Sequence, residues 1–373
     1  MGVEYKQMLT DYLVNMEQSE KENENTMVIS NIQSKEDVQK MIHSLKNVKN
    51  GTTICFFGNY PYAKLFEYIP KNIEVFIKNY GRKYNINDLE AMGKNFWVYD
   101  MDNDKAVRDG LITQKVIVRP TALLKREKFY LDILSKIEEE NLTPLEALTY
   151  IYYKVISTKN ARQFKAGDVL VNNDVHSTTN DWNSAKNTAL VLADNYMDCK
   201  GTSELIIEAV EQLNMPGLTA DRVRCHLQGE GHQINKFIIN DSFYGVNGVY
   251  FCDSIPDNKY TKNYMETSNL DVNLNFISHF LLTKEEMQKM KNYEFRGGNH
   301  IINTIENSKN IDGTTYALLL NKLGTINGVS SDVINDFLFL SSICFKMSHG
   351  FEKYFGHENT EKVENYLNKS SKK

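Results

Sequence analysis

Three residues in the middle of the chain have the types and the order that thiol catalysis needs. Cys199 comes first, His232 follows it, and Asp253 comes last. A cysteine thiolate is a nucleophile, an imidazole takes and returns a proton, and a carboxylate holds that imidazole in one orientation. We therefore interpret Cys199 as a candidate nucleophile, His232 as its base and Asp253 as the residue that orients the base.

The local sequence predicts that Cys199 lies at the start of a helix. Apolar side chains follow it at helical spacing, at Leu205, Ile206, Ala209, Val210 and Leu213. The first backbone amides of a helix have no partner within the helix, and the helix dipole is positive there, so this position stabilises a thiolate. The Met215-Pro216-Gly217 run is then expected to end the helix.

Short strands are expected to carry the other two residues. Apolar residues alternate or cluster in Val223–Leu227 and Asn235–Ile239, and His232 lies at the start of the second run. A third strand, Val249–Cys252, ends at Asp253. If these strands are antiparallel neighbours, Asp253 lies beside His232 while the nucleophile helix packs against the sheet.

The local sequences around these residues resemble those of the transglutaminase-like superfamily. The segments that carry the resemblance are Cys199-Lys200-Gly201, Asn214-Met215-Pro216-Gly217, Gly231-His232-Gln233-Ile234-Asn235 and Asn247-Gly248-Val249-Tyr250-Phe251-Cys252-Asp253. The resemblance covers roughly residues 140–257. It implies a papain-like core, in which a nucleophile helix packs on an antiparallel sheet, and a Cys-His-Asp triad formed by the three residues above.

This sequence departs from the family pattern beside the base. Gln233-Ile234 stand where members commonly have Ala-Trp, Ser254-Ile255-Pro256 replace a Pro-Thr-Trp run, and the connection at residues 240–246 is longer than usual. These differences concern the preferred substrate more than the triad.

Four further residues are candidates for binding the substrate. Trp182 and Asn183 follow a polar loop and are expected to line the cleft or to help hold the oxyanion, although a packing role for Trp182 is an equal alternative. Gly231 and Asn235, on either side of His232, are expected to contact the substrate.

Other reactive residue types have simpler interpretations. His226 and His232 flank Glu230, but no further ligand at suitable spacing supports a metal site, and we expect neither a metal nor a cofactor. Cys225 and Cys252 fall within predicted strands and are expected to be packed thiols. Since strand side chains alternate, Cys252 should face away from Asp253.

The chain as a whole predicts an α+β protein with three regions. Residues 1–120 form an α/β region, 121–260 the core, and 261–373 a mainly helical region. Expected strands are Thr26–Ile32, Thr52–Phe57, Ile73–Ile77 and Phe96–Tyr99. Expected helices are 3–16, 34–46, 123–137, 144–157, 185–192, 283–292, 298–308, 314–323 and 331–355.

Bulk properties exclude several classes of partner. The formal charge is -5, 41% of the residues are apolar, and dense basic stripes are missing from the sequence, so nucleic acid is not an expected partner. The sequence has neither a secretory signal nor an apolar run of about 18 residues, so we expect no membrane partner and a cytoplasmic location. The five scattered cysteines predict reduced thiols rather than a disulfide framework.

Two functions remain open from the sequence. The first is acyl transfer on an amide or peptide bond of a protein or peptide substrate, through a thioester. Water as the second nucleophile makes this a protease or amidase reaction, an amine makes it a transglutaminase reaction, and we favour water because it is always present. The alternative is an inactive scaffold that retains the core to bind a protein or peptide.

Overall fold

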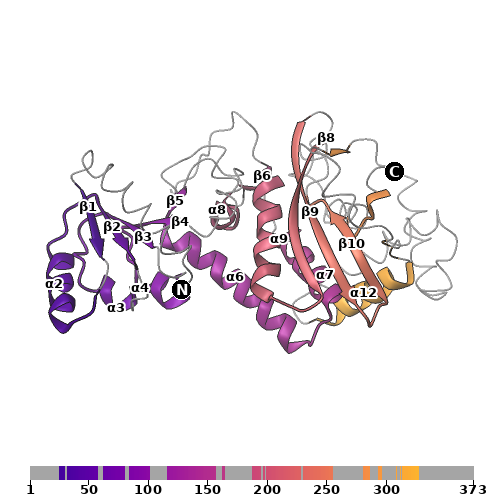
Figure 1. Cartoon of the computed structure of the whole chain (residues 1–373), viewed down its shortest axis with the longest axis horizontal. Coiled ribbons are helices and arrows are strands. Elements are labelled where there is room, and N and C mark those ends of the chain that lie inside the picture. Colours follow the sequence, from indigo (N-terminus) through magenta and orange to yellow (C-terminus); the bar gives the residue numbers. More distant parts are fainter. Residues whose placement is uncertain are drawn as a thin grey trace, which may run out of the picture. The chain divides into compact units, whose positions relative to one another are not determined.

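The computed structural model describes residues 25–29, 32–57, 62–79, 84–100, 116–156, 162–163, 187–194, 196–197, 199–227, 230–254, 280–285, 293–295, 308, 311 and 313–326 (Figure 1). The protein is α+β, with one mixed sheet, one antiparallel sheet and helices. It divides into two compact units, the first made of Met1–Lys128 with Val169–Ser184, and the second of Phe129–Asp168 with Ala185–Lys373. The division thus lies a few residues after position 120, and the described part of 261–373 belongs to the second unit.

The first unit contains a five-stranded sheet with the order β1-β2-β3-β4-β5. Its strands are β1 (Thr26–Ile29), β2 (Thr52–Phe56), β3 (Val75–Asn79), β4 (Phe96–Asp100) and β5 (Val116–Val118). The first four strands are parallel and β5 is antiparallel to β4. The connecting helices are α2 (Lys35–Lys46), α3 (Tyr62–Phe66) and α4 (Ile86–Ala91). The α/β prediction for this region is confirmed.

The start of α2 follows from its sequence. The Ser34 side chain accepts a hydrogen bond from the Asp37 backbone amide, and the Asp37 carboxylate accepts one from the Ser34 amide in return. This capping box satisfies two amides that lack a partner within the helix. Met41 and Leu45 then lie four residues apart on the buried face.

The second unit combines helices with an antiparallel sheet. The helices are α6 (Pro120–Glu139, which begins in the first unit), α7 (Pro144–Ile156), α8 (Thr188–Asp194), α9 (Cys199–Leu213) and α12 (Gly313–Thr325). The sheet has the order β10-β9-β8-β11, with β8 (Leu218–Leu227), β9 (Glu230–Asp241), β10 (Val246–Cys252) and β11 (Tyr293–Phe295). A small parallel pair joins β6 (Arg162–Gln163) to β7 (Tyr196–Met197).

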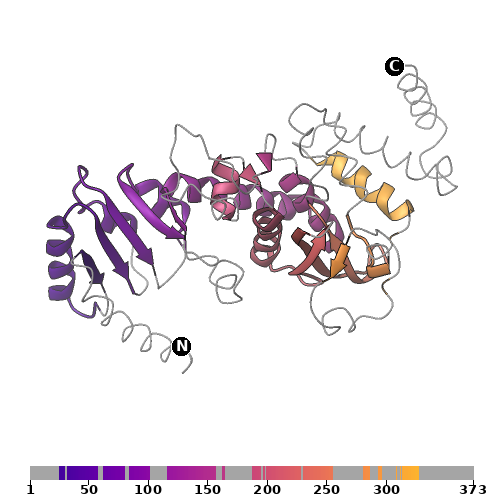
Figure 2. The same cartoon turned by 90° about the horizontal axis from the view of Figure 1, so that it is seen from above.

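A continuous apolar core lies between α7, α9 and one face of the antiparallel sheet (Figure 2). Fully or almost fully buried members include Leu148, Ile151, Leu205, Ile206, Phe237 and Ile239. The other sheet face has a smaller cluster, with Val223, Cys225, Ile234, Val249, Phe251 and Leu282. Both faces of the sheet therefore bury side chains, and the alternation of each strand decides which cluster a residue joins.

A tight turn connects α9 to β8. Asn214 has a positive φ of 46° and Gly217 one of 85°, conformations that end a helix and that glycine adopts without strain. A Cβ atom at Gly217 would lie 2.4 Å from the carbonyl oxygen of Asn240, so the turn also needs glycine because of its close approach to β9. The predicted helix end at this run is confirmed.

The downstream region contains more strand structure than the sequence predicted. α12 matches the helix expected at 314–323, and residues 284–285 are helical at the start of the one expected at 283–292. β11 pairs with β8 and was not predicted, and Leu282 bridges Phe251 on β10. The expected helices at 3–16 and 331–355, and nearly all of 298–308, lie outside the described residues. Within the described residues, none of the helices has the length and apolar character needed to cross a membrane.

Candidate active site

The first turn of α9 presents Cys199. This residue is the first of the helix and is partly exposed, whereas Gly201, Thr202 and Ser203 behind it are buried. Its backbone amide belongs to the first turn, whose amides have no acceptor within the helix. The predicted position of Cys199 at a helix start is confirmed.

His232 and Asp253 form the best-defined contact of the site. Nε2 of His232 lies 2.8 Å from Oδ2 of Asp253, within hydrogen-bond distance. Both side chains are buried, with exposed fractions of 8% and 1%. Because the carboxylate occupies Nε2, the ring nitrogen left for another partner is Nδ1.

Cys199 is a further partner of the same imidazole. Burial lowers the pKa of His232, but the charge of Asp253 and its hydrogen bond raise it, and a hydrogen bond and charge interaction with Cys199 raise it further. The net effect raises the pKa of His232 to about 11. The protonated imidazolium is therefore the favoured form of His232 at neutral pH, between a carboxylate on one side and the sulfur of Cys199 on the other.

The antiparallel register brings the base and the carboxylate together. β9 pairs with β10 so that Cys252 is opposite Asn235, and Asp253 follows directly after β10. Asp253 thus emerges from the sheet next to the part of β9 that contains His232. The hydroxyl of Tyr152, on α7, donates a hydrogen bond of 2.7 Å to the backbone carbonyl of Asp253 and fixes this strand end.

Polar side chains fasten the start of α9 to the sheet. Nδ2 of Asn235 donates to the carbonyl oxygen of Ser203 at 2.9 Å, one turn after Cys199. Nε and Nη2 of Arg222 donate to the two carboxylate oxygens of Glu204 at 2.8 and 2.7 Å. Such a fork is directional, so it restrains both the distance and the rotation of the helix relative to β8.

Gln233 and Ile234 on β9 face the protein interior. Nε2 of Gln233 donates to Oε1 of Glu204 at 3.0 Å, and Ile234 belongs to the smaller apolar cluster. Gln233 therefore helps to hold α9. Only about 2% of its surface is exposed, so it is not placed to line an open cleft.

Comparison of the chain with protein-family models, with curated proteins and with solved structures finds no match. The functional interpretation therefore depends on the residues of the site and their geometry.

The predicted binding residues have different positions. Gly231 is exposed, and a Cβ atom built on it would meet nothing within 4 Å. Asn235 is fully buried, and its amide holds the start of α9. Trp182 and Asn183 lie outside the described residues.

The neighbouring thiols are packed, as the sequence predicted. Cys225 lies opposite His232 on β8, and burial, with the charges of Asp253 and Cys199, raises the pKa of its thiol to about 12. Cys252 is buried in the larger core, on the sheet face away from Cys225, and its sulfur accepts a hydrogen bond from the Leu281 amide. Burial raises the pKa of Cys252 as well. Both residues are therefore poor nucleophiles.

The described part of the chain contains no group of three or more His, Cys, Asp or Glu side chains arranged to hold a metal ion. Residues that the sequence did not single out are Tyr152, Glu204 and Arg222. The sequence could have pointed to Tyr152, because this tyrosine lies in an apolar helix, where a buried hydroxyl needs a hydrogen-bond partner. The carbonyl that it contacts is 101 positions away in sequence, so only the fold identifies the partner.

Proposed function

We propose that this protein is a cysteine-dependent enzyme that cleaves or transfers the acyl group of an amide or peptide bond. The observation that carries the proposal is that one imidazole, that of His232, has Asp253 at Nε2 and the sulfur of Cys199 as a second partner. A helix start, a base and an orienting carboxylate are the parts of a papain-like thiol site, and their order in the chain resembles the transglutaminase-like superfamily.

In the first half of the reaction, the thiolate of Cys199 attacks the carbonyl carbon of the amide. The carbonyl π electrons move to oxygen, and the first amides of α9 are suited to stabilise the resulting oxyanion. The imidazolium of His232 then gives a proton to the amide nitrogen. The C–N bond breaks, the amine leaves, and the acyl group remains on Cys199 as a thioester.

In the second half, His232 is neutral and acts as a base. It takes a proton from a water molecule or an amine, which attacks the thioester carbonyl. Collapse of the second oxyanion releases Cys199 as a thiolate, and His232 is again an imidazolium. Water yields an acid, and an amine yields a new amide. We favour water, because it is always present.

A labelling experiment tests whether His232 activates Cys199. Wild-type protein and the Cys199→Ala, His232→Ala and His226→Ala variants are treated with iodoacetamide between pH 5 and 8, and the modified residue is identified by mass spectrometry. We expect Cys199 of the wild type to react faster at pH 6 than in His232→Ala, because the imidazolium of His232 is a partner of its sulfur. His226→Ala, which removes a histidine from the same sheet, should leave the rate unchanged.

Cys225 and Cys252 are internal references, because they are buried and should label slowly in every variant. Equal labelling of Cys199 in the wild type and in His232→Ala would contradict the proposed enzyme. A fast, His232-dependent reaction without turnover of any peptide library would instead favour the scaffold alternative. Acyl-enzyme detected by intact mass spectrometry after mixing with the library would decide for catalysis.

A further inference from the structure

We propose that Gln233 and Asn235 are positioning residues of the thiol site, which hold the start of α9 against β9 at a cost in stability. This inference rests on the proposed function, because the two amides would act through the nucleophile and base of that same site. It is carried by one hydrogen bond from each amide to α9, and by an oxygen of each amide that is buried without a partner among the described residues.

The two amide side chains of β9 contact α9 within two turns of Cys199. Nε2 of Gln233 donates to Oε1 of Glu204 at 3.0 Å. Nδ2 of Asn235 donates to the backbone carbonyl oxygen of Ser203 at 2.9 Å. Ser203 is four residues after Cys199, a distance of about 6 Å along a helix. Both hydrogen bonds therefore act on the stretch of helix that presents the sulfur.

The same amides are close to the base along the strand. Gln233 directly follows His232, and Asn235 is the third residue after it, which is about 10 Å along a strand. His232 itself has the sulfur of Cys199 as a partner. The strand and the helix are thus joined at three positions close together in each element. A shift of α9 along β9 would break the two amide hydrogen bonds and change the distance from sulfur to imidazole.

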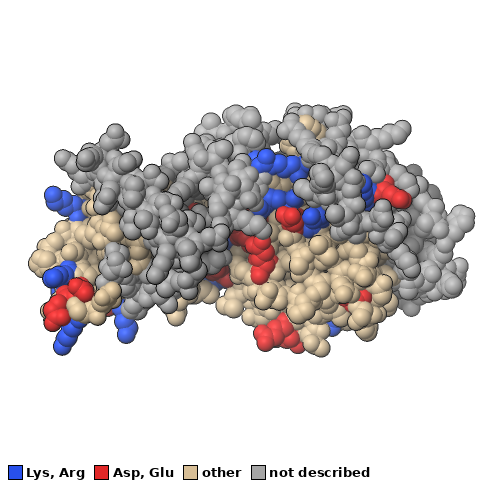
Figure 3. Space-filling view, in the orientation of Figure 1, with Lys and Arg blue, Asp and Glu red and all other residues tan. Residues whose placement is uncertain are grey.

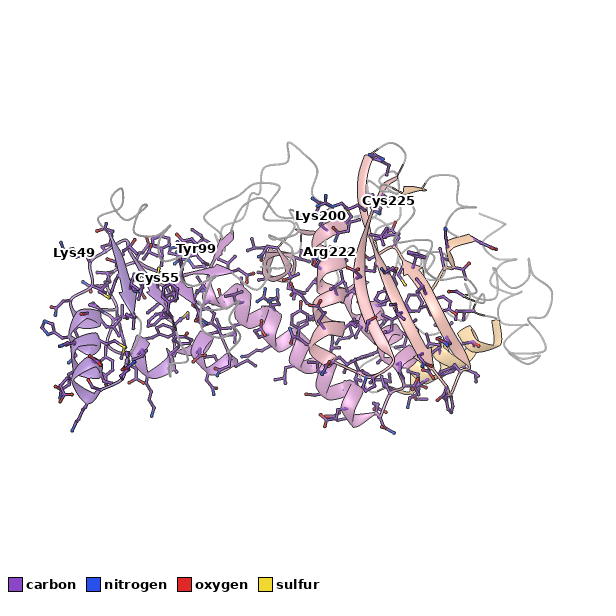
Figure 4. All side chains as sticks on the ribbon, in the orientation of Figure 1. Lys49, Cys55, Tyr99, Lys200, Arg222 and Cys225 are labelled. Atoms are coloured by element: carbon purple, nitrogen blue, oxygen red, sulfur yellow. The ribbon has the colours of Figure 1, made fainter. Side chains whose placement is uncertain are left out.

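An ion pair holds the acceptor of Gln233 in place. Arg222, on β8, donates from Nε and Nη2 to the two carboxylate oxygens of Glu204. Figure 4 shows Arg222 beside α9. Oε1 of Glu204 therefore accepts hydrogen bonds from side chains on two neighbouring strands, at 2.8 Å from Arg222 and at 3.0 Å from Gln233. If the Gln233 amide is removed, the glutamate keeps its arginine.

Each amide also carries an unfavourable feature. Among the residues that the structure describes, Oε1 of Gln233 and Oδ1 of Asn235 have no hydrogen-bond partner. The two residues are 2% and 0% exposed. A buried acceptor without a partner lowers stability, and an apolar side chain of similar shape avoids that loss. Packing alone would therefore favour methionine and leucine here. A local conflict between polarity and burial is expected at a functional site.

These side chains act from beneath the surface. On the face of the molecule in Figure 3, basic and acidic side chains lie near one another over α9 and β8. The Arg222 and Glu204 side chains are only 10% and 4% exposed, and the two amides are buried more deeply. A reagent that reacts with the partly exposed Cys199 does not meet the amides. Their influence on its reaction rate must come from the position of the sulfur.

Gln233→Met and Asn235→Leu remove the amides and keep the approximate side-chain size. We expect each to slow alkylation of Cys199 by iodoacetamide at pH 6 about three- to tenfold, and the double variant to slow it further, because a displacement of about 1 Å can cost up to about a hundredfold in rate. At pH 9, above the ordinary thiol pKa of about 8.5, the rates should approach that of the wild type. The midpoint of urea unfolding should be unchanged or higher.

Thr149→Val is the matched control. It removes a buried hydroxyl that donates to the Leu145 carbonyl oxygen within α7 at 2.7 Å, and it should leave the alkylation rate unchanged at both pH values. A double variant that reacts at the wild-type rate at pH 6, or that loses the same factor at pH 6 and pH 9, would overturn the proposal. A lower urea midpoint in both single variants would also overturn it, because the amides would then be ordinary stabilising contacts.

Failure of this inference is distinguishable from failure of the proposed function. If His232→Ala does not slow alkylation of Cys199 at pH 6, the proposed function is wrong. If His232→Ala slows the reaction but the double variant at positions 233 and 235 does not, the thiol site stands and only the positioning role is wrong.

Discussion

The hydroxyl of Tyr152 lies 2.7 Å from the backbone carbonyl of Asp253, and both residues are buried. This hydrogen bond joins α7 to the point where Asp253 leaves the sheet. The ring of Tyr152 packs against Phe280 at 4.6 Å between centroids. The tyrosine therefore combines a packing role with a positioning role.

Tyr152→Phe separates these two roles, because the ring remains and the hydroxyl is lost. We expect a loss of about 1 to 3 kcal/mol in the free energy of unfolding, since the Asp253 carbonyl is left buried without this donor. We also expect slower alkylation of Cys199 at pH 6, as Asp253 holds His232 less firmly. Tyr150→Phe, two residues earlier in α7, is the control. A loss of stability with an unchanged alkylation rate would assign Tyr152 a structural role only.

The protonation of His232 predicts a particular pH dependence of stability. Its pKa rises from 6.5 to about 11 on folding, so the folded state retains a proton that the unfolded state loses. The stabilisation is complete below pH 6.5 and decreases as the pH rises from 6.5 to 11, by at most about 1.4 kcal/mol per pH unit.

Asp253→Asn should remove most of this dependence, because the charge of Asp253 is the main cause that raises the pKa. Urea unfolding at several pH values is expected to show a difference between wild type and variant that shrinks above pH 6.5. NMR of labelled histidine should show an imidazolium at pH 8 in the wild type and a neutral ring in the variant. A difference that grows with pH would refute this assignment.

The Arg222–Glu204 pair should behave as a buried ion pair. Removing one partner by Glu204→Leu or Arg222→Met leaves a buried charge, which costs about 3 to 5 kcal/mol. Replacing both leaves no buried charge, although the Gln233 amide loses its Glu204 acceptor, so the double variant should be more stable than either single variant. Urea denaturation of the wild type, the two single variants and the double variant gives the coupling energy between Arg222 and Glu204. Additive losses in the free energy of unfolding would show that the two side chains act independently.

The turn after α9 predicts a contrast between two glycines. Gly217 and Gly245 both have positive φ, so alanine strains each by about 1 to 2 kcal/mol. At Gly217 the added Cβ also lies 2.4 Å from the Asn240 carbonyl oxygen, whereas at Gly245 it meets nothing within 4 Å. Thermal unfolding should therefore show a loss of about 3 kcal/mol or more for Gly217→Ala and a smaller one for Gly245→Ala. Equal losses would mean that the turn moves away from β9.

Local pattern explains most of the elements that were predicted correctly. The helix that begins at Cys199 has apolar residues at helical spacing and a Pro-Gly stop, and Ser34 with Asp37 caps α2 through neighbouring residues. These signals act within a few positions. Strand ends were less accurate, as β8 and β9 extend well beyond Val223–Leu227 and Asn235–Ile239, because a strand ends where its partner ends.

The sequence by itself determined the helix start that presents Cys199, the strands that carry His232 and precede Asp253, and the order of the three. Tertiary structure alone decided that the side chains of Asn235 and Gln233 contact α9 and that the hydroxyl of Tyr152 supports Asp253. The physical reason is how far apart in the sequence the interacting residues lie. Helical periodicity and capping depend on residues close in the chain, whereas the facing of a side chain depends on register and on partners far away in sequence.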